Sequence, residues 1–124
     1  MVRNYNLMRN ILKKVNASVK PLSFGDFQRY GSSEDVRLEL IRLKKEGLIE
    51  HNMTWSCGSF DGGEISAITE NGIMFLRDIQ NDTVWNIIEK TLEEADLDLS
   101  YPLLKDVCDE IVKRYVMGKI PSDI

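Results

Sequence analysis

The stretch ITENGIMFLRDIQNDTVW, residues 68–85, decides the fold of this chain. Its first residue ends a segment of strand-like alternation, and Thr69 carries a side-chain oxygen suited to cap the helix that follows. Gly72 lies inside that helix, where glycine costs roughly 1 kcal/mol against alanine, so we expect a close backbone approach to the preceding strands or to the first helix. The inward-facing residues of this helix are predicted to be Phe75, Leu76 and Ile79.

The same stretch ends one helix and begins the next. Asn81 is predicted to end the first helix and Asp82 to cap the second, because short polar side chains favour helix ends. Apolar residues then recur at the spacing of one helix face. They are Val84, Trp85, Ile88, Leu92 and Ala95.

A β-hairpin is predicted upstream, at residues 48–69. The segment LIEHNMTWS alternates between two faces with a period of two, which is typical of a strand. CGSFDGGE is rich in turn residues and predicts the hairpin tip, and EISAIT predicts the returning strand. One face of the first strand is expected to hold Ile49, His51, Met53 and Trp55.

Helices are predicted before the hairpin at three places. The first covers residues 4–16, and the second is a short, weak helix at residues 24–29 that neighbouring proline and glycine residues limit. The third begins after Ser32 or Ser33 and ends before Gly47, with acidic residues in its first turn and basic residues in its last. Inward residues are Leu7, Met8, Ile11, Leu12 and Val15 in the first helix and Val36, Leu40 and Leu43 in the third.

This order of helices and a hairpin is that of a winged helix-turn-helix, in which the strands form the wing. We therefore predict an α+β, mainly α fold with a winged-helix core at residues 1–80 and a C-terminal helical extension at residues 81–124. The extension includes a helix that Ser100 can cap, with Pro102 in its first turn and Gly118 at its end. Its apolar residues cover more than half of the circumference, so we expect it to pack on the core or to form a dimer interface. They are Leu103, Leu104, Val107, Cys108, Ile111, Val112, Tyr115 and Val116.

Residues 68–85 resemble the pattern L-T-x-x-G-x-x-F-L-x-x-I-x-x-D-x-x-W of a family of small bacterial and phage-borne proteins without a known function. The first helix and GLIE after the third helix extend the resemblance over most of residues 4–95. The chain departs from the pattern at Ile68, where the family usually has leucine, and at Glu70, where an aromatic residue is frequent. The resemblance implies a winged-helix scaffold related to phage or prophage proteins, and it supplies no catalytic residues.

The composition is that of one soluble domain, with 43% hydrophobic and 29% charged residues among 124. No run approaches the roughly 18 apolar residues of a membrane span, and the N-terminal segment lacks the features of a signal peptide, so we expect a cytoplasmic protein without a membrane partner. Cys57 and Cys108 lie far apart and match neither a redox pair nor a zinc-ligand spacing. Free thiols are therefore expected.

No set of side chains matches a catalytic or metal site. His51 has no second histidine beside it and is expected to be a half-buried strand residue. Cys57 has no clear histidine partner, and the neighbouring glycines lack the lysine and the following helix of a phosphate-binding loop. We expect no enzyme activity, no cofactor and no metal. The carboxylates at one helix end are expected to be solvated, and they are Glu93, Glu94, Asp96 and Asp98.

Double-stranded DNA is the main partner that we predict, because a winged helix places its third helix in the major groove and lets the wing touch the backbone or minor groove. The net charge of −4 is uneven: residues 1–80 carry 11 Lys+Arg against 10 Asp+Glu, whereas residues 81–124 carry 5 against 10. The wing presents Asp61 and Glu64 and no basic residue, which opposes this hypothesis. The alternative is a protein–protein interaction module on the same scaffold. The residues expected to bind DNA are Arg29, Arg37, Arg42, Lys44 and Lys45.

A homodimer is the predicted assembly. The last helix is unusually apolar and follows a second amphipathic helix at residues 83–95, and helices added after a wing often pair across a two-fold axis. The competing interpretation is a monomer in which the last helix folds back between the first helix and the Trp85 helix. The residues of the predicted dimer interface are Leu104, Val107, Ile111 and Tyr115.

Overall fold

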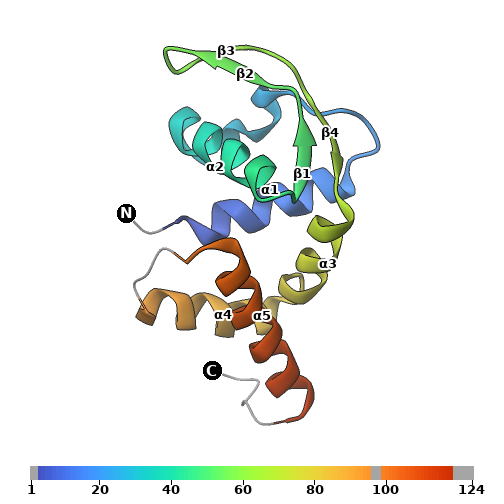
Figure 1. Cartoon of the computed structure of the whole chain (residues 1–124), viewed down its shortest axis with the longest axis vertical. Coiled ribbons are helices and arrows are strands. Elements are labelled where there is room, and N and C mark those ends of the chain that lie inside the picture. The colour runs from blue at the N-terminus through green and yellow to red at the C-terminus, as the bar shows by residue number, and fades with distance from the viewer. Residues whose placement is uncertain (1–2, 96–98, 119–124) are drawn as a thin grey trace. The chain divides into compact units, whose positions relative to one another are not determined.

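The computed structural model describes residues 3–95 and 99–118, and its helices outweigh its short strands (Figure 1). This confirms the predicted fold class at the level of α+β, mainly α. The elements in chain order are α1 (Tyr5–Ala17), the 3-10 helix η1 (Phe24–Tyr30), α2 (Ser33–Lys45), β1 (Ile49–His51), β2 (Thr54–Ser56), β3 (Ser59–Gly62), β4 (Ile65–Ile68), α3 (Glu70–Ile79), α4 (Asp82–Ala95) and α5 (Tyr101–Val116).

The chain divides into two compact units. The first is Leu7–Ile73, and the second joins Met1–Asn6 to Met74–Ile124. The division falls inside α3, earlier than the boundary that we predict at residues 80 and 81. Packing of the C-terminal helices on the core stays a prediction.

The helices that begin the first unit follow the sequence pattern closely. α1 matches the first predicted helix within one residue at each end, and every residue of its predicted inward stripe is buried. The weak second helix is the 3-10 helix η1, the form that short helical segments often take. At its start the Ser23 N–H donates to Asp26 Oδ2 at 2.8 Å, and Phe24 and Phe27 are buried.

The predicted hairpin is present as two consecutive antiparallel pairs, β1 with β4 and β2 with β3. The chain bends between the two pairs, and in Figure 1 β2 and β3 turn away from β1 and β4 and run above α2. At the bend Asn52 Oδ1 accepts a hydrogen bond from the Glu64 N–H at 2.7 Å. Gly63 has a φ of 103°, and a β-carbon there would collide with the Asn52 carbonyl group, so this position requires glycine.

The hairpin tip is shorter than the sequence predicts. Only Cys57 and Gly58 form the turn, with φ values of 52° and 83°, as a tight two-residue hairpin loop requires. The segment Ser59–Gly62 is strand β3, so its assignment to the turn was wrong. Trp55 and Phe60 face each other across β2 and β3, and such aromatic pairs stabilise strands that glycine-rich composition alone would assign to a loop.

Thr69 and Gly72 confirm the interpretation of the stretch that decides the fold. Thr69 Oγ1 accepts a hydrogen bond from the Gly72 N–H at 3.0 Å and donates one to the Gly47 carbonyl oxygen at 2.6 Å. A β-carbon at position 72 would collide with the Leu48 carbonyl oxygen, so the close approach is to the start of the hairpin. The predicted inward residues Phe75, Leu76 and Ile79 are all buried.

The start of α4 differs by one residue from the prediction. Asn81 caps the helix, because its Oδ1 accepts a hydrogen bond from the Val84 N–H at 3.0 Å. Asp82 is instead the first residue of α4, where its negative charge favours the helix dipole. Ala95 was wrongly placed on the inward face: it is the last residue of the helix and is exposed, whereas Ile87 is buried.

α5 begins where the sequence predicts. Ser100 occupies the N-cap position, although its side chain makes no capping hydrogen bond, and the Leu104 N–H donates to its carbonyl oxygen at 2.9 Å. The predicted end is confirmed by Gly118, whose φ is 72°. Part of the wide apolar surface remains open to solvent. The buried residues of α5 are Leu104, Cys108 and Ile111, and its exposed large apolar residues include Leu103 and Val116.

Both cysteines are free thiols, as predicted, with Cys57 exposed and Cys108 buried. Burial raises the pKa of Cys108 to about 12, so this thiol stays protonated at neutral pH. Within residues 3–95 and 99–118, no helix has the length and apolar character needed to cross a membrane.

Candidate nucleic-acid interface

An open groove runs between α2 and the hairpin strands, within the unit Leu7–Ile73. Its volume is about 770 Å³. Helix α2 forms one wall, and the hairpin segment from His51 to Gly58 forms the other. The lining residues are Arg37, Ile41, Lys44, Lys45, His51, Met53, Thr54, Trp55, Cys57 and Gly58.

Helix α2 supplies the cationic wall. Ser32 Oγ accepts a hydrogen bond from the Asp35 N–H at 3.1 Å, which confirms the predicted cap and fixes where the helix begins. The buried face consists of Val36, Glu39, Leu40 and Leu43. Residues three and four apart share one side of a helix, so Arg37, Ile41 and Lys44 reach the groove together, with Lys45 beside them.

The hairpin wall is built by alternation. Burial alternates from Ile49 to Trp55 as predicted, although the predicted single strand is divided into β1 and β2 by the bend at residues 52–53. His51, Met53 and Trp55 line the groove together with Thr54. Trp55 is held by two further rings: Phe24 of η1 meets it edge-on at 5.6 Å between ring centroids, and Phe60 of β3 lies at 5.8 Å. Phe24 also stacks on Phe60 at 5.1 Å. The 3-10 helix therefore positions the hairpin wall.

His51 is buried rather than half-buried as predicted, with 7% of its surface exposed. Its Nε2 lies 3.0 Å from the Leu40 carbonyl oxygen, which only accepts, so Nε2 carries the proton. Its Nδ1 accepts a hydrogen bond from the Met53 N–H at 3.2 Å and is therefore unprotonated. Burial lowers the pKa of His51 below 6.5, the Leu40 carbonyl opposes this effect, and the Lys44 charge adds to it. The imidazole is a neutral connection between α2 and β1.

The residues that line the groove give it positive charge. None of the described residues that line it is an aspartate or a glutamate. Lys44 and Lys45 are exposed, and no other described residue forms an ion pair with either. Arg37 lies 3.8 Å from Glu34, whose side chain is 74% exposed, so this pair is weak. The arrangement suits an anion with apolar parts, because the opposite wall holds Met53 and Trp55.

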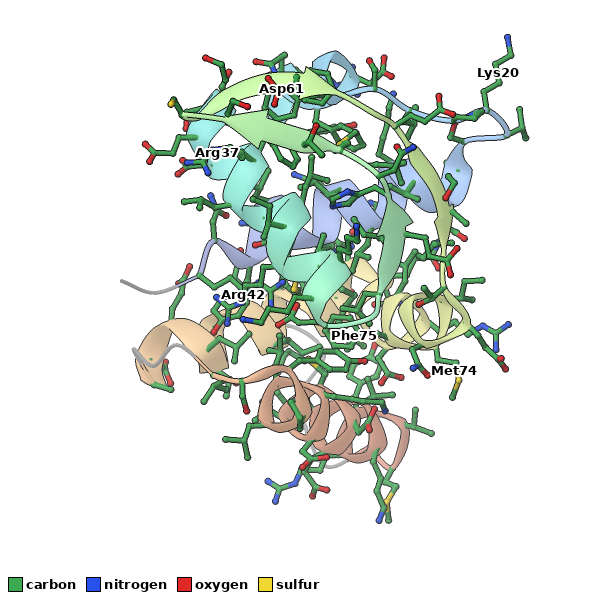
Figure 2. The ribbon with its side chains drawn as sticks, turned by 45° about the horizontal axis from the view of Figure 1, so that its top comes forward. Lys20, Arg37, Arg42, Asp61, Met74 and Phe75 are labelled. Atoms are coloured by element: carbon green, nitrogen blue, oxygen red, sulfur yellow. The ribbon has the colours of Figure 1, made fainter. Side chains whose placement is uncertain are left out.

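The structure brings together only part of the predicted DNA-binding set. Arg37, Lys44 and Lys45 line the groove, whereas Arg42 and Arg29 do not. Figure 2 shows Arg37 on the part of α2 near the hairpin tip and Arg42 further along the helix. Arg42 Nε donates to Glu46 Oε2 at 3.4 Å, and Arg29 lies over the Tyr30 ring at 5.2 Å.

Several groove residues were missing from the predicted set. The predicted set was limited to basic residues, so it did not include the apolar Ile41 of α2 or Met53 and Trp55 of the hairpin segment. The helical and strand periods of the sequence could have identified some of these residues. Spacing of four and three along α2 selects Arg37, Ile41 and Lys44, and spacing of two along the hairpin selects His51, Met53 and Trp55. Neither period selects Thr54 or Gly58, which also line the groove.

The predicted dimer residues do not all lie on the surface. Leu104 is fully buried and Ile111 is 8% exposed within the single chain, whereas Val107 and Tyr115 are half-buried. A second groove of about 440 Å³ lies between α4 and α5, with Ile87 among its lining residues. Val107 and Ile111 also contribute to it. The dimer stays a prediction.

A pair of carboxyl groups in the second unit was not predicted. Asp78 of α3 and Asp109 of α5 are hydrogen-bonded, and Lys105 Nζ donates to Asp109 Oδ2 at 2.8 Å. Burial, followed by the hydrogen bond and negative charge of Asp109, raises the pKa of Asp78 to about 7. The hydrogen bond from Asp78 lowers the pKa of Asp109. Below about pH 7, Asp78 therefore keeps a proton that it can donate to Asp109.

Among the described residues, no group of histidine, cysteine, aspartate and glutamate side chains could hold a metal ion. Glu93 and Glu94 are exposed at the end of α4, as expected for a solvated helix end. Asp96 and Asp98 lie outside the described residues.

The fold and the groove define a small, mainly helical α+β protein whose helix–hairpin unit carries a cationic cleft. The family model described as "Hypothetical protein (DUF2513)" matches residues 2–98, and the chain belongs to this family. An uncharacterized protein of Haemophilus influenzae is 33% identical over 122 residues, an alignment that covers 92% of this chain and 98% of that protein. No solved structure matches the chain.

Proposed function

We propose that the chain is a DNA-binding, transcriptional regulator-like protein that uses a winged-helix arrangement. In this proposal α2 enters the major groove of double-stranded DNA, and the β2–β3 hairpin is the wing. The observation that carries it is the convergence of Arg37, Lys44 and Lys45 on one groove whose described lining includes no carboxylate.

The order of elements supports this arrangement. Helices α1, η1 and α2 precede the hairpin, and the hairpin leads into α3 through the Thr69 cap. A fold alone is only an analogy for function, so the charge of the groove is the feature that favours DNA binding. Lysine and arginine side chains that neutralise phosphates supply most of the sequence-independent affinity for DNA.

A protein–protein interaction module is the second candidate. The charge of the wing favours this candidate, because the wing carries the acidic Asp61 and no lysine or arginine lies in the hairpin. Asp61 accepts a hydrogen bond from Ser56 Oγ at 2.5 Å. Figure 2 shows Asp61 at the outer edge of the hairpin. Leu38 on α2 is 50% exposed and would suit an apolar partner.

The salt dependence of binding separates the two candidates. We expect fluorescence anisotropy with a short random-sequence duplex to show binding at low salt that weakens steeply as salt rises. The slope of log K against log salt should be about −0.9 for each phosphate contacted. The double variant Lys44→Glu with Lys45→Glu should lose affinity and reduce the magnitude of this slope by about 2.

The matched control is Lys13→Glu with Lys20→Glu, which changes the net charge equally at exposed residues outside the groove. Figure 2 shows Lys20 at the end of a loop, pointing away from α2. The control should keep most of the affinity. If both double variants lost the same affinity, the loss would reflect net charge and not the position of Lys44 and Lys45. If the unaltered protein did not bind the duplex at low salt, the proposed non-specific contact with phosphates would be refuted.

A further inference from the structure

Two large apolar side chains occupy the outer face of α2. Leu38 is 50% exposed and Ile41 is 40% exposed, although the same helix buries Val36, Leu40 and Leu43 on its other side. At about 100° per residue, both lie on the face opposite the buried one. Scattered apolar residues on a surface need no explanation, but these two are neighbours three positions apart on the helix that carries the groove cations.

Cations flank this apolar pair. Arg37 and Lys44 lie on one side of it, and Lys45 lies next to it toward the end of the helix. In a complex with duplex DNA, flanking cations contact phosphates and set the register of the helix, whereas the residues between them face the base edges. This face also holds Glu34 in the first turn of α2, and its apolar residues are Leu38 and Ile41.

Apolar side chains limit what can be read. In the major groove each base pair presents hydrogen-bond donors and acceptors, and the thymine C5-methyl group is the apolar feature. Leucine and isoleucine neither donate nor accept, so they gain by covering a methyl group and lose by desolvating polar base edges. Their contacts would favour thymine over the other bases.

We propose that Leu38 and Ile41 contact thymine methyl groups in the major groove and give this chain a preference for thymine-containing sites. The inference rests on the proposed DNA binding and names what the site reads. A duplex that lacks the thymine methyl groups tests this inference separately from DNA binding itself, because removal of a methyl group leaves the phosphates unchanged.

The test compares an alternating A·T duplex with the same duplex in which uracil replaces thymine. We expect the thymine duplex to bind about fourfold more tightly for each methyl group that is covered, from the free energy of burying one CH₂ group. A second pair of probes, a G·C duplex with cytosine or with 5-methylcytosine, separates the methyl group from the shape of A·T sequences. Binding should again be tighter with the methyl group.

The double variant Leu38→Ala with Ile41→Ala should bind thymine and uracil duplexes equally and keep its salt dependence. Both residues are exposed, so the variant should fold, which circular dichroism checks. The control Val19→Ala, at a residue 97% exposed and outside the groove, should keep the methyl preference. Salt-dependent binding without a methyl preference overturns this inference and leaves DNA binding standing. Absence of binding to every duplex at low salt overturns both.

Discussion

A single imidazole joins the cationic helix to the hairpin wall. His51 donates through Nε2 to Leu40 of α2 and accepts through Nδ1 from Met53, so both ring nitrogens are engaged only while the ring is neutral. Protonation would place a second N–H against the Met53 N–H, beside the charge of Lys44. The residue therefore makes the stability of the groove depend on pH.

We expect the variant His51→Asn to lose less stability in mild acid than the unaltered protein does. The folded chain holds the pKa of His51 below 6.5, so the stabilisation from the neutral ring is complete above about 6.5 and is lost as pH falls below that value. Urea unfolding of both proteins above and below this pH measures the effect. The variant should be less stable at high pH and should lose less on acidification. An equal loss in both proteins would contradict the assignment.

At the scale of elements, α3 and α5 are joined by carboxyl groups that share a proton. Asp78 and Asp109 come from different helices, and Lys105 pairs with Asp109 one turn along α5. Near the pair, Cys108 is buried, and Phe75 of α3 meets Tyr101 of α5 edge-on at 5.4 Å. The helices are thus held by apolar packing next to a proton-dependent contact. The effect of pH on this contact is opposite in sign to its effect on His51.

The variant Asp78→Asn is expected to stabilise the protein above pH 7. Folding raises the pKa of Asp78 from 3.8 to about 7, so its stabilising contribution is present at low pH and is lost as pH rises through about 7. The amide can still donate to Asp109 without bringing a charge. Because Asp78 is partly exposed and solvent screens its charge, we expect the free energy of unfolding to rise by only on the order of 1 kcal/mol. Urea midpoints measured at several pH values decide this, and a variant less stable than the parent above pH 7 would contradict it.

The sequence predicted elements well where local rules dominate. Ser32, Thr69 and the periods of α1 and α2 located helices closely, because caps and apolar spacing act within a few residues. Strand β3 was missed, because a glycine-rich segment becomes a strand only through its pairing with β2. Pairings that depend on tertiary distance cannot be read from spacing, as Asp78 and Asp109 illustrate.

The candidate site was predictable in part for the same reason. Helical spacing identified Arg37, Lys44 and Lys45 as cations on an exposed helix. It could not distinguish them from Arg42, which pairs with Glu46, or from Arg29, which lies over Tyr30. Side-chain geometry determines whether a basic residue of this region contacts a partner within the chain or faces the open groove.

At the scale of the whole molecule, the acidic excess lies in residues 81–124, whereas residues 1–80 are nearly balanced, with 11 basic against 10 acidic residues. The groove cations lie in the unit Leu7–Ile73, whereas residues 81–124 carry 5 basic against 10 acidic residues. The second unit also exposes large apolar side chains on and just after α5, including Val116, which is 77% exposed, and Met117, which is 57% exposed. We expect a second copy of the chain, and not DNA, to cover this apolar surface.

Light scattering after size exclusion is expected to give twice the chain mass of 14.3 kDa at tens of micromolar. The informative variant is Val107→Asp, because Val107 is only half-buried and lines the groove between α4 and α5, whereas Ile111→Asp would disturb the buried side of the helix. We expect Val107→Asp to halve the mass and keep the helical signal, and the control Val19→Asp to leave the mass unchanged. A single-chain mass for the unaltered protein would exclude the dimer.

The bend at Asn52 sets a condition on how the groove is used. Gly63 lies against the Asn52 backbone, Asn52 Oδ1 holds the Glu64 N–H, and the rings of Phe24 and Phe60 hold Trp55. The groove walls are thus preorganised before any ligand arrives. Association then requires little ordering of the chain, and the entropy that a flexible arm loses on binding is lost here during folding. Loosening this bend should therefore weaken binding even though no contact with the ligand is removed.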